Sequence, residues 1–207
     1  KIASSDVFVF LDDVQYKKRE FQNRNKIRTK DGFIWLTVPV ITKGKYFQKI
    51  NEVEIDTTSN WQAEHWKSIE LNYKGTQFFE MYAPEIKRFY EKNWRWLKDL
   101  NVETVSVILE ILGIKKKILF SSEMNLSSSK TERIIDICKY LKADTYLSGS
   151  GAGDYLEENR FAESGIKLLY QEYKHPVYKQ KFQGFEPCLS AVDLIFNEGP
   201  RASEIIQ

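Results

Sequence analysis

The second half of the chain contains three short, mostly apolar runs: Ile118-Leu119-Phe120, Thr145-Tyr146-Leu147 and Ile166-Lys167-Leu168-Leu169-Tyr170. Helical patterns separate them, at 130–141 and at about 152–163. An alternation of strands and helices is typical of a parallel sheet with right-handed connections. The sequence therefore predicts an α/β fold with a mostly parallel sheet and flanking helices, Rossmann-like in its class.

The first half adds two apolar runs and a helical region. Residues 7–11 are unbroken apolar chain ended by Asp12-Asp13, which is typical of a strand buried on both faces of a parallel sheet. Residues 33–40 have the same character, with Pro39 marking an edge or the end of pairing. Pro84 favours a helix start, and Gly113 favours a helix end. We expect one domain over 1–207, with a helical insertion at about 43–112.

Composition excludes several classes of protein. The 207 residues carry 31 Lys and Arg against 29 Asp and Glu, so the net charge of +2 predicts no general attraction to nucleic acid or membranes. Cys138 and Cys188 have no disulfide or zinc spacing, which indicates neither a disulfide framework nor a zinc site and favours a reducing compartment. No apolar run approaches the ~20 residues that span a bilayer, and residues 1–6 have no signal-peptide core. We expect a cytoplasmic protein without membrane insertion.

The carboxyl ends of the predicted strands select the candidate site. In open α/β sheets ligands bind there, because the loops converge and helix N-termini point outward. The rule selects residues after four strands: Asp12, Asp13, Gln15 and Tyr16, then Ser121 and Ser122, then the loop 148–154, and finally residues 173–175, which include His175. We take Asp12 as a candidate catalytic residue and Gln15 as a candidate substrate contact.

A glycine-rich loop follows the predicted strand at 145–147. It reads Ser148-Gly149-Ser150-Gly151-Ala152-Gly153-Asp154-Tyr155. Glycines let the backbone approach a ligand, and exposed N–H groups cradle phosphate or carboxylate. The loop lacks the lysine of a P-loop and does not match GxGxxG, so no nucleotide class is indicated. The alternative is a flexible turn. We predict that Ser148, Gly149, Ser150, Gly151, Asp154 and Tyr155 contact substrate.

A basic cluster follows the first strand. Within it, Arg24 suits a phosphate or carboxylate, while Asn23 and Asn25 suit sugar hydroxyls. The alternative is a solvated basic loop, which we favour for Lys17, Lys18 and Lys30. We predict that the Asn23-Arg24-Asn25 group contacts substrate.

The two histidines differ in their surroundings. His175 follows a strand and precedes Pro176, which makes it the candidate catalytic base. His65 lies on a helical face with Trp61 and is kept as a candidate substrate contact, with a packed histidine as the alternative. Asp193, inside an apolar helix, is interpreted as a buried carboxylate that ties the helix to a backbone N–H, with the orientation of a site residue as the alternative.

The motifs, taken in order, resemble the WbqC-like family. They are Val9-Phe10-Leu11-Asp12-Asp13-Val14-Gln15-Tyr16, Asn23-Arg24-Asn25-Lys26-Ile27, Leu36-Thr37-Val38-Pro39-Val40, Tyr146-Leu147-Ser148-Gly149, Gly153-Asp154-Tyr155-Leu156, His175-Pro176-Val177-Tyr178 and Leu189-Ser190-Ala191-Val192-Asp193-Leu194. The resemblance implies a bacterial protein encoded in gene clusters for lipopolysaccharide O-antigen and related glycans. Members of this family usually begin with a His-Gln-Pro segment before the part matching residues 2–6, so we expect a strand and a site histidine that the sequence given does not include. With that strand restored, the start is similar to the HUP-type nucleotidylyltransferase fold.

The sequence and the resemblance together lead to one main hypothesis. We expect a transferase that modifies a nucleotide-linked amino sugar by acyl or aminoacyl transfer in surface-polysaccharide synthesis. Two alternatives stay open: nucleotidyl transfer with release of pyrophosphate, and a non-catalytic binding member of a glycan-assembly complex. The predicted partner is a nucleotide-linked sugar or another phosphorylated small molecule. The sequence identifies no cofactor and leaves the oligomeric state open, a homodimer included.

Overall fold

The computed structural model describes residues 1–149, 151 and 156–206, and they form two compact units. The first unit consists of residues 1–13 and 116–174, and the second of residues 14–115 and 175–207. The fold is mixed α/β, with short parallel sheets flanked by helices, as the sequence predicts. The expectation of one domain with an insertion at 43–112 stays a prediction.

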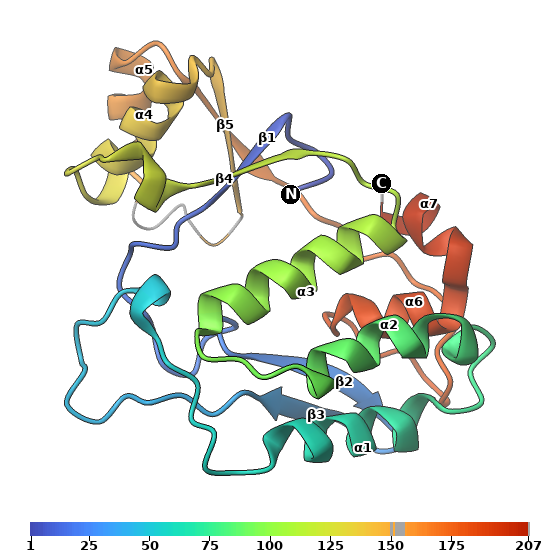
Figure 1. Ribbon diagram of the computed structural model, residues 1–207. Coiled ribbons are helices and arrows are strands. Elements are labelled where there is room, and N and C mark those ends of the chain that lie inside the picture. The colour runs from blue at the N-terminus through green and yellow to red at the C-terminus, as the bar shows by residue number, and fades with distance from the viewer. Residues whose placement is uncertain (150, 152–155, 207) are drawn as a thin grey trace. The chain divides into compact units, whose positions relative to one another are not determined.

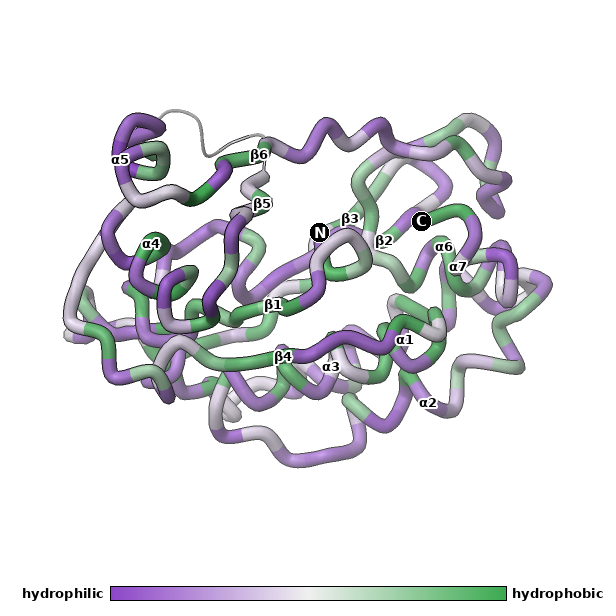
Figure 2. The backbone as a smooth tube through the Cα atoms, turned by 90° about the horizontal axis from the view of Figure 1, so that it is seen from above, coloured by the Kyte–Doolittle hydropathy of each residue, from purple (hydrophilic) through white to green (hydrophobic). Residues whose placement is uncertain are grey.

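The first unit contains two parallel strand pairs (Figure 1). In one, β1 (Val7–Phe10) pairs with β4 (Lys117–Phe120), and in the other, β5 (Thr145–Gly149) pairs with β6 (Lys167–Gln171). The chain turns from hydrophilic to hydrophobic where residues 115–117 lead into β4 (Figure 2). Strands of this kind are apolar because both of their faces are covered.

Helices of the first unit follow the strands in the predicted order. The 3₁₀ helix η2 (Ser121–Met124) leads from β4 towards α4 (Lys130–Leu141), and α5 (Glu158–Glu163) precedes β6. The helix expected at 152–163 therefore begins at 158 among the described residues, and its predicted first turn lies outside them. Ser129 is the N-cap of α4, but its side chain makes no capping hydrogen bond. A small core of Ile135, Cys138, Leu156, Phe161 and Ile166 holds these elements together.

The second unit is built on an antiparallel hairpin, and this corrects the sequence prediction for residues 33–40. β2 (Arg24–Thr29) pairs with β3 (Gly32–Thr37), with Thr29 opposite Gly32. Residues 33–40 are therefore not a doubly buried strand of a parallel sheet, and Phe33 and Ile34 are each 38% exposed. Residues 24–29, for which the sequence predicts no strand, form one. The hairpin buries only one face, so its other face keeps polar and aromatic side chains.

Helices α1 (Trp61–Tyr73) and α6 (Ala191–Glu198) pack against β2. The other helices of the unit are α2 (Phe79–Glu91), α3 (Leu97–Ile111) and α7 (Ala202–Ile206), with the short 3₁₀ helices η1 (Ile50–Glu52) and η4 (Gly199–Arg201). The core includes Ile27, Val53, Ile69, Tyr73 and Phe196. No helix among the described residues is long and apolar enough to cross a membrane.

The helix boundaries include one further correction. Pro84 lies inside α2, which begins at Phe79, so the proline does not start the helix. The earlier start is supported because the N–H of Tyr82 bonds to the carbonyl of Phe78. Proline at this position costs the helix one backbone hydrogen bond. The predicted end of α3 is confirmed, since Gly113 follows its C-cap with a φ of 65°.

Candidate functional site

The carboxyl ends of β1 and β4 bring Asp12 against two serines of η2. Because the strands are parallel, the chain beyond Phe10 and the chain beyond Phe120 leave the same edge. Asp12, only 3% exposed, accepts hydrogen bonds from the Ser122 N–H at 3.0 Å and the Ser122 Oγ at 2.7 Å. The carboxylate of this candidate catalytic residue is therefore oriented by η2.

Asp13 belongs to the same edge and forms a buried ion pair with Arg133. The Ser121 Oγ donates to Asp13 Oδ1 at 2.5 Å, and the Arg133 guanidinium donates to Asp13 Oδ2. Arg133 also donates to the carbonyls of Leu126 and Ser128, so α4 is tied to the loop before it. The side chains of Arg133 and Asp13 are only 9% and 16% exposed. Sequence reasoning missed Arg133, because its position in α4 gives no signal of a partner beyond the end of β1.

The carboxyl end of β5 holds the start of the glycine-rich loop. Ser148 is 1% exposed, and its hydroxyl lies within 3.4 Å of the Gly149 carbonyl. A Cβ on Gly149 would lie 3.1 Å from the Lys1 side chain, whereas a Cβ on Gly151 would have open space around it. Of these two glycines, Gly149 alone has a close neighbour, which is the flexible end of the Lys1 side chain. The predicted contacts Ser150, Asp154 and Tyr155 lie outside the described residues.

The predicted Asn23-Arg24-Asn25 group lies at the start of β2, and its members face different surroundings. Asn23 is buried, and its Nδ2 donates to the carbonyl of Val38 at 2.8 Å, which joins the chain before β2 to the chain after β3. Asn25 is exposed, and its Oδ1 accepts from the N–H of Lys26 at 2.8 Å. Arg24 donates to the carbonyl of Arg19. The two asparagines thus stabilise the local backbone in the structure.

The outward face of the hairpin places cations over aromatic rings. The Arg24 guanidinium lies 4.2 Å from the centre of the Trp35 ring, and the Lys26 ammonium lies 4.1 Å from that of Phe33. Phe21 packs beside Trp35 with a centroid distance of 5.3 Å and is 62% exposed. In an antiparallel pair, opposite residues share a face, and Lys26 is opposite Trp35. We call these five residues the cation–aromatic face.

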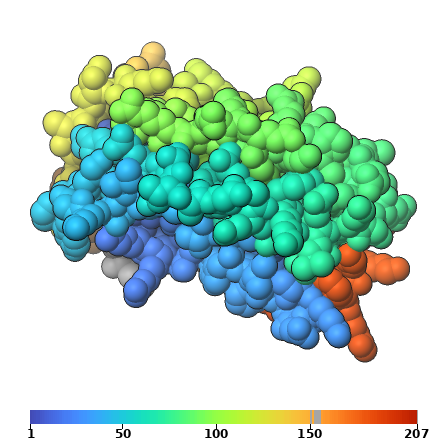
Figure 3. All heavy atoms as spheres, turned by 60° about the horizontal axis from the view of Figure 1, so that its bottom comes forward, coloured from blue at the N-terminus to red at the C-terminus, as the bar shows by residue number. Residues whose placement is uncertain are grey.

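The cation–aromatic face was missed in the sequence, although a signal was present. Arg24, Lys26 and Arg28 alternate along one strand, and Phe33 and Trp35 alternate along the next, which is the period of a strand face. Figure 3 shows the blue atoms of this part of the chain at the surface, next to the orange-red atoms of the segment beyond His175. Arg28 joins the hairpin to that segment, because its guanidinium donates to the Gln183 carbonyl at 2.8 Å.

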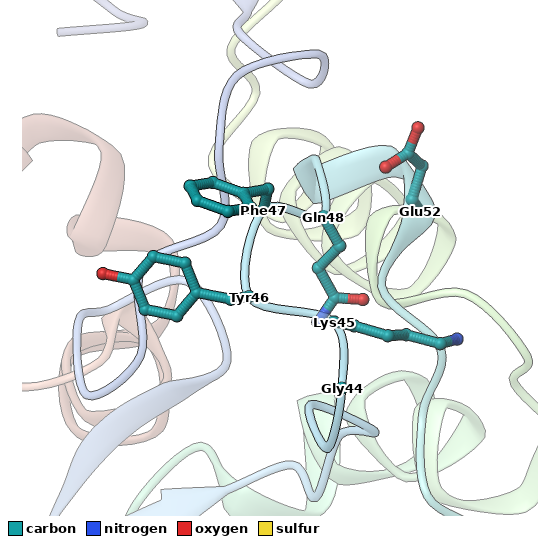
Figure 4. Close-up of a pocket in the computed structure, with 6 residues that line it drawn as sticks. All are labelled: Gly44, Lys45, Tyr46, Phe47, Gln48 and Glu52. Atoms are coloured by element: carbon teal, nitrogen blue, oxygen red, sulfur yellow. The ribbon is translucent and has the colours of Figure 1, made fainter.

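Gln15 supports a loop that borders an open cavity of about 560 Å³. Its Nε2 donates to the carbonyl of Tyr46 at 3.1 Å. Tyr46 and Phe47 are 73% and 80% exposed and meet edge to face. Their rings project to one side of the loop, and Gln48 runs to the other side towards Lys45 (Figure 4). In the structure Gln15 thus positions this aromatic pair through the backbone.

His65 lies in the core of the second unit. It is 9% exposed and packs edge to face on Trp61, with ring centres 5.2 Å apart. Burial lowers the pKa of His65 from 6.5 to about 4, and a hydrogen bond with the backbone of Thr37 opposes that shift only in part. A neutral ring packed in this way matches the alternative of a structural histidine. These packing interactions do not test whether His65 binds substrate, which stays a prediction.

His175 is partly buried in an aromatic cluster. Its Nδ1–H donates to the Pro176 carbonyl at 2.8 Å, because a carbonyl oxygen can only accept. The proton-accepting nitrogen of the neutral ring is then Nε2. The ring lies against Tyr178 at 6.4 Å and Phe185 at 5.6 Å between centres. This geometry is compatible with a general base.

Asp193 connects the surroundings of His175 to the core. It is fully buried and accepts hydrogen bonds from the hydroxyls of Tyr73 at 2.9 Å and Tyr178 at 2.8 Å, and from Gln180 Nε2 at 3.0 Å. Burial raises the pKa of Asp193, and these donors counteract the shift. The carboxylate ties α6 to α1 and to the segment 178–180, through side-chain donors and not through the backbone N–H expected from the sequence. Tyr178, which touches both Asp193 and His175, was missed in the sequence.

The predicted site residues fall on both units. In the first unit lie Asp12, Ser148, Gly149 and Gly151. In the second unit lie Gln15, Asn23, Arg24, Asn25, His65 and His175. Their convergence on one pocket stays a prediction. Within the described ranges, no group of three or more His, Cys, Asp or Glu side chains is arranged to hold a metal ion.

Comparison with known proteins gives a match over nearly the whole chain. The sequence model described as the WbqC-like protein family matches residues 1–205. The chain belongs to the WbqC-like family. A protein of Mycobacterium tuberculosis described as "Uncharacterized protein Rv1507c" is 38% identical to this WbqC-like chain over 208 aligned positions, which cover 100% of the chain and 90% of the relative. No solved structure gives a significant match.

Proposed function

We propose that this protein is a transferase that modifies a nucleotide-linked amino sugar, by acyl or aminoacyl transfer, in the synthesis of bacterial surface polysaccharide. Membership of the WbqC-like family supports the biological context, since members of the family often occur in polysaccharide gene clusters. The observation that carries the proposal is the cation–aromatic face of the hairpin, because its cations and aromatic rings suit a nucleoside diphosphate.

A nucleotide-linked sugar carries two phosphates, a planar base and sugar rings. The segment from Lys17 to Lys30 has seven basic residues and one acidic residue, although the whole chain is nearly neutral. Arg24 and Lys26 rest on the rings of Trp35 and Phe33, which fixes where their charges lie. Phosphate is attracted to fixed cations, and Phe21 offers an exposed ring surface to a base.

The transfer step also requires a base. When an amine nitrogen of the sugar attacks an acyl carbon, a new C–N bond forms, the bond from the acyl carbon to its carrier breaks, and the nitrogen loses a proton. Nε2 of His175 accepts that proton in this proposal, because Nδ1 already carries a proton that is bonded to Pro176. Tyr178 and Asp193 hold the ring in place.

Isothermal titration calorimetry with UDP and with UDP-N-acetylglucosamine tests the proposal. We expect both to bind, with affinity that falls as salt rises, and the double variant Arg24→Ala/Lys26→Ala to bind about tenfold or more weakly. The matched control is Lys67→Ala, an exposed lysine on α1, which should bind like the parent protein. Binding unchanged by the double variant, or no binding of either nucleotide, contradicts the proposal.

A further inference from the structure

The second unit contains a groove between α1 and α2 that no predicted site residue lines. It has a volume of about 320 Å³ and is lined by Asn60, Gln62, Ala63, Trp66, Lys87, Tyr90, Glu91 and Asn93. This volume lies at the small end of the range for ligand pockets, roughly 300–1,000 Å³. The two helices pack side by side (Figure 1), and Trp66 meets Phe79 and Tyr90 between them.

The floor of the groove is aromatic and well supported. The Trp66 indole is stacked on Phe79 at 6.2 Å and is tilted against Tyr90 at 6.1 Å between ring centres. Gln62 fastens α1 to the end of α2, because its Nε2 donates to the carbonyl of Tyr90 at 3.3 Å and to that of Lys92 at 2.8 Å. The indole is thus held in place before any ligand arrives, which lowers the entropic cost of binding.

Two side-chain amides at the rim are not used by the protein. Asn60 is the N-cap of α1, yet its side chain makes no capping hydrogen bond. Neither Asn60 nor Asn93 forms a side-chain hydrogen bond within the part of the chain that the structure describes, and both side chains are exposed. Each amide offers two donors and one acceptor to a ligand.

The charges of the groove disfavour an anion. The Lys87 ammonium pairs with the Glu91 carboxylate at 3.2 Å and lies 5.9 Å from the centre of the Trp66 ring, so the cation that lines the groove is already engaged. A phosphate would therefore gain little from Lys87 and would be repelled by Glu91. This separates the groove from the cation–aromatic face, where the charges are mainly positive.

We infer that the groove is a binding site for an uncharged saccharide unit. One face of a pyranose ring consists of C–H groups with partial positive charge, which pack on the negative face of an indole such as Trp66. Its hydroxyls both donate and accept, which matches the amides of Asn60 and Asn93. The ligand is a sugar ring without phosphate, and the inference does not depend on the proposed transferase activity or on nucleotide binding at the hairpin.

The test uses NMR with N-acetylglucosamine as the neutral probe and glucose 6-phosphate as the anionic probe. We expect saturation transfer from the protein to the ring protons of N-acetylglucosamine, and a shift of the Trp66 indole signal, one of five tryptophans in the chain. The variant Trp66→Phe identifies that signal. Glucose 6-phosphate should bind more weakly than the neutral sugar.

Variants then decide whether the groove is responsible. Asn60→Ala/Asn93→Ala removes two exposed amides that make no side-chain hydrogen bond in the described structure, so the fold should be unaffected, and the dissociation constant should rise about fivefold or more. Asn159→Ala, at an exposed asparagine of α5, is the matched control and should leave binding unchanged. No shift of Trp66, tighter binding of glucose 6-phosphate, or equal binding by the double variant would each overturn the inference.

Discussion

Two arginines with different surroundings lie near predicted site residues. One reaches the carboxyl ends of β1 and β4, and the other lies on the outward face of the β2–β3 hairpin. Arg133 is buried and is consumed by Asp13 and two backbone carbonyls. Arg24 donates to one carbonyl and lies over the Trp35 ring at the surface. Burial demands that a charge be compensated inside the protein, whereas a surface cation keeps hydrogen-bonding capacity for a ligand. Polar residues at the predicted strand ends are therefore not equally available to a substrate.

The largest expected effect comes from breaking the buried pair. Arg133→Ala leaves Asp13 with an uncompensated buried charge, and we expect the free energy of unfolding to fall by about 3–5 kcal/mol. Urea denaturation followed by circular dichroism measures it. The matched control is Arg160→Ala, whose side chain is 49% exposed and pairs with Glu132 on the surface, so its loss should cost less than about 1 kcal/mol. If the two variants lose the same free energy of unfolding, the buried Asp13–Arg133 pair is no more important for stability than an exposed ion pair.

The second effect concerns the core beneath the hairpin, where His65 is bonded to the backbone of Thr37. Burial lowers the pKa of His65 from 6.5 to about 4, so between these values the unfolded chain binds the proton and the folded protein does not. Stability is then fully present above pH ~6.5 and is lost as the pH falls towards ~4, by about 3 kcal/mol in total. A carbon-detected NMR titration gives the pKa directly.

A variant isolates the contribution of this histidine to stability. His65→Gln has no proton to gain, so its stability should change less between pH 6.5 and 4 than that of the parent protein. If the ring of His65 titrates near its ordinary value instead, the core under the hairpin is open to water. The residue would then return to the set of residues available to a ligand.

Most of the first unit could be predicted from its sequence. The runs at 118–120, 145–147 and 166–170 are strands to within two residues, and the helix at 130–141 has the predicted bounds. Apolar periodicity and turn residues decide these elements locally, so they need little tertiary information. The rule for strand ends likewise located Asp12 beside Ser122.

The hairpin could not be predicted in the same way. The alternating side chains of β2 are cations, so an analysis based on apolar residues finds no strand there. The burial of Asn23 against Val38 and of Asp13 against Arg133 depends on pairings far apart in the chain. The sequence shows which side chains are polar, but only the tertiary structure shows which of them are already hydrogen-bonded or paired within the protein.

The smallest expected effect on stability is at the cation–aromatic face. Lys26→Ala removes an ammonium over the exposed Phe33 ring, and an exposed cation–π contact contributes only about 0.5–1 kcal/mol. We expect the free energy of unfolding to fall by no more than that, close to the value for the control Lys67→Ala. Urea denaturation under the conditions used for Arg133→Ala gives the comparison. A loss of several kcal/mol would make Lys26 part of a structural clasp like the Asp13–Arg133 pair, and the hairpin face would then have no cation to spare for a phosphate.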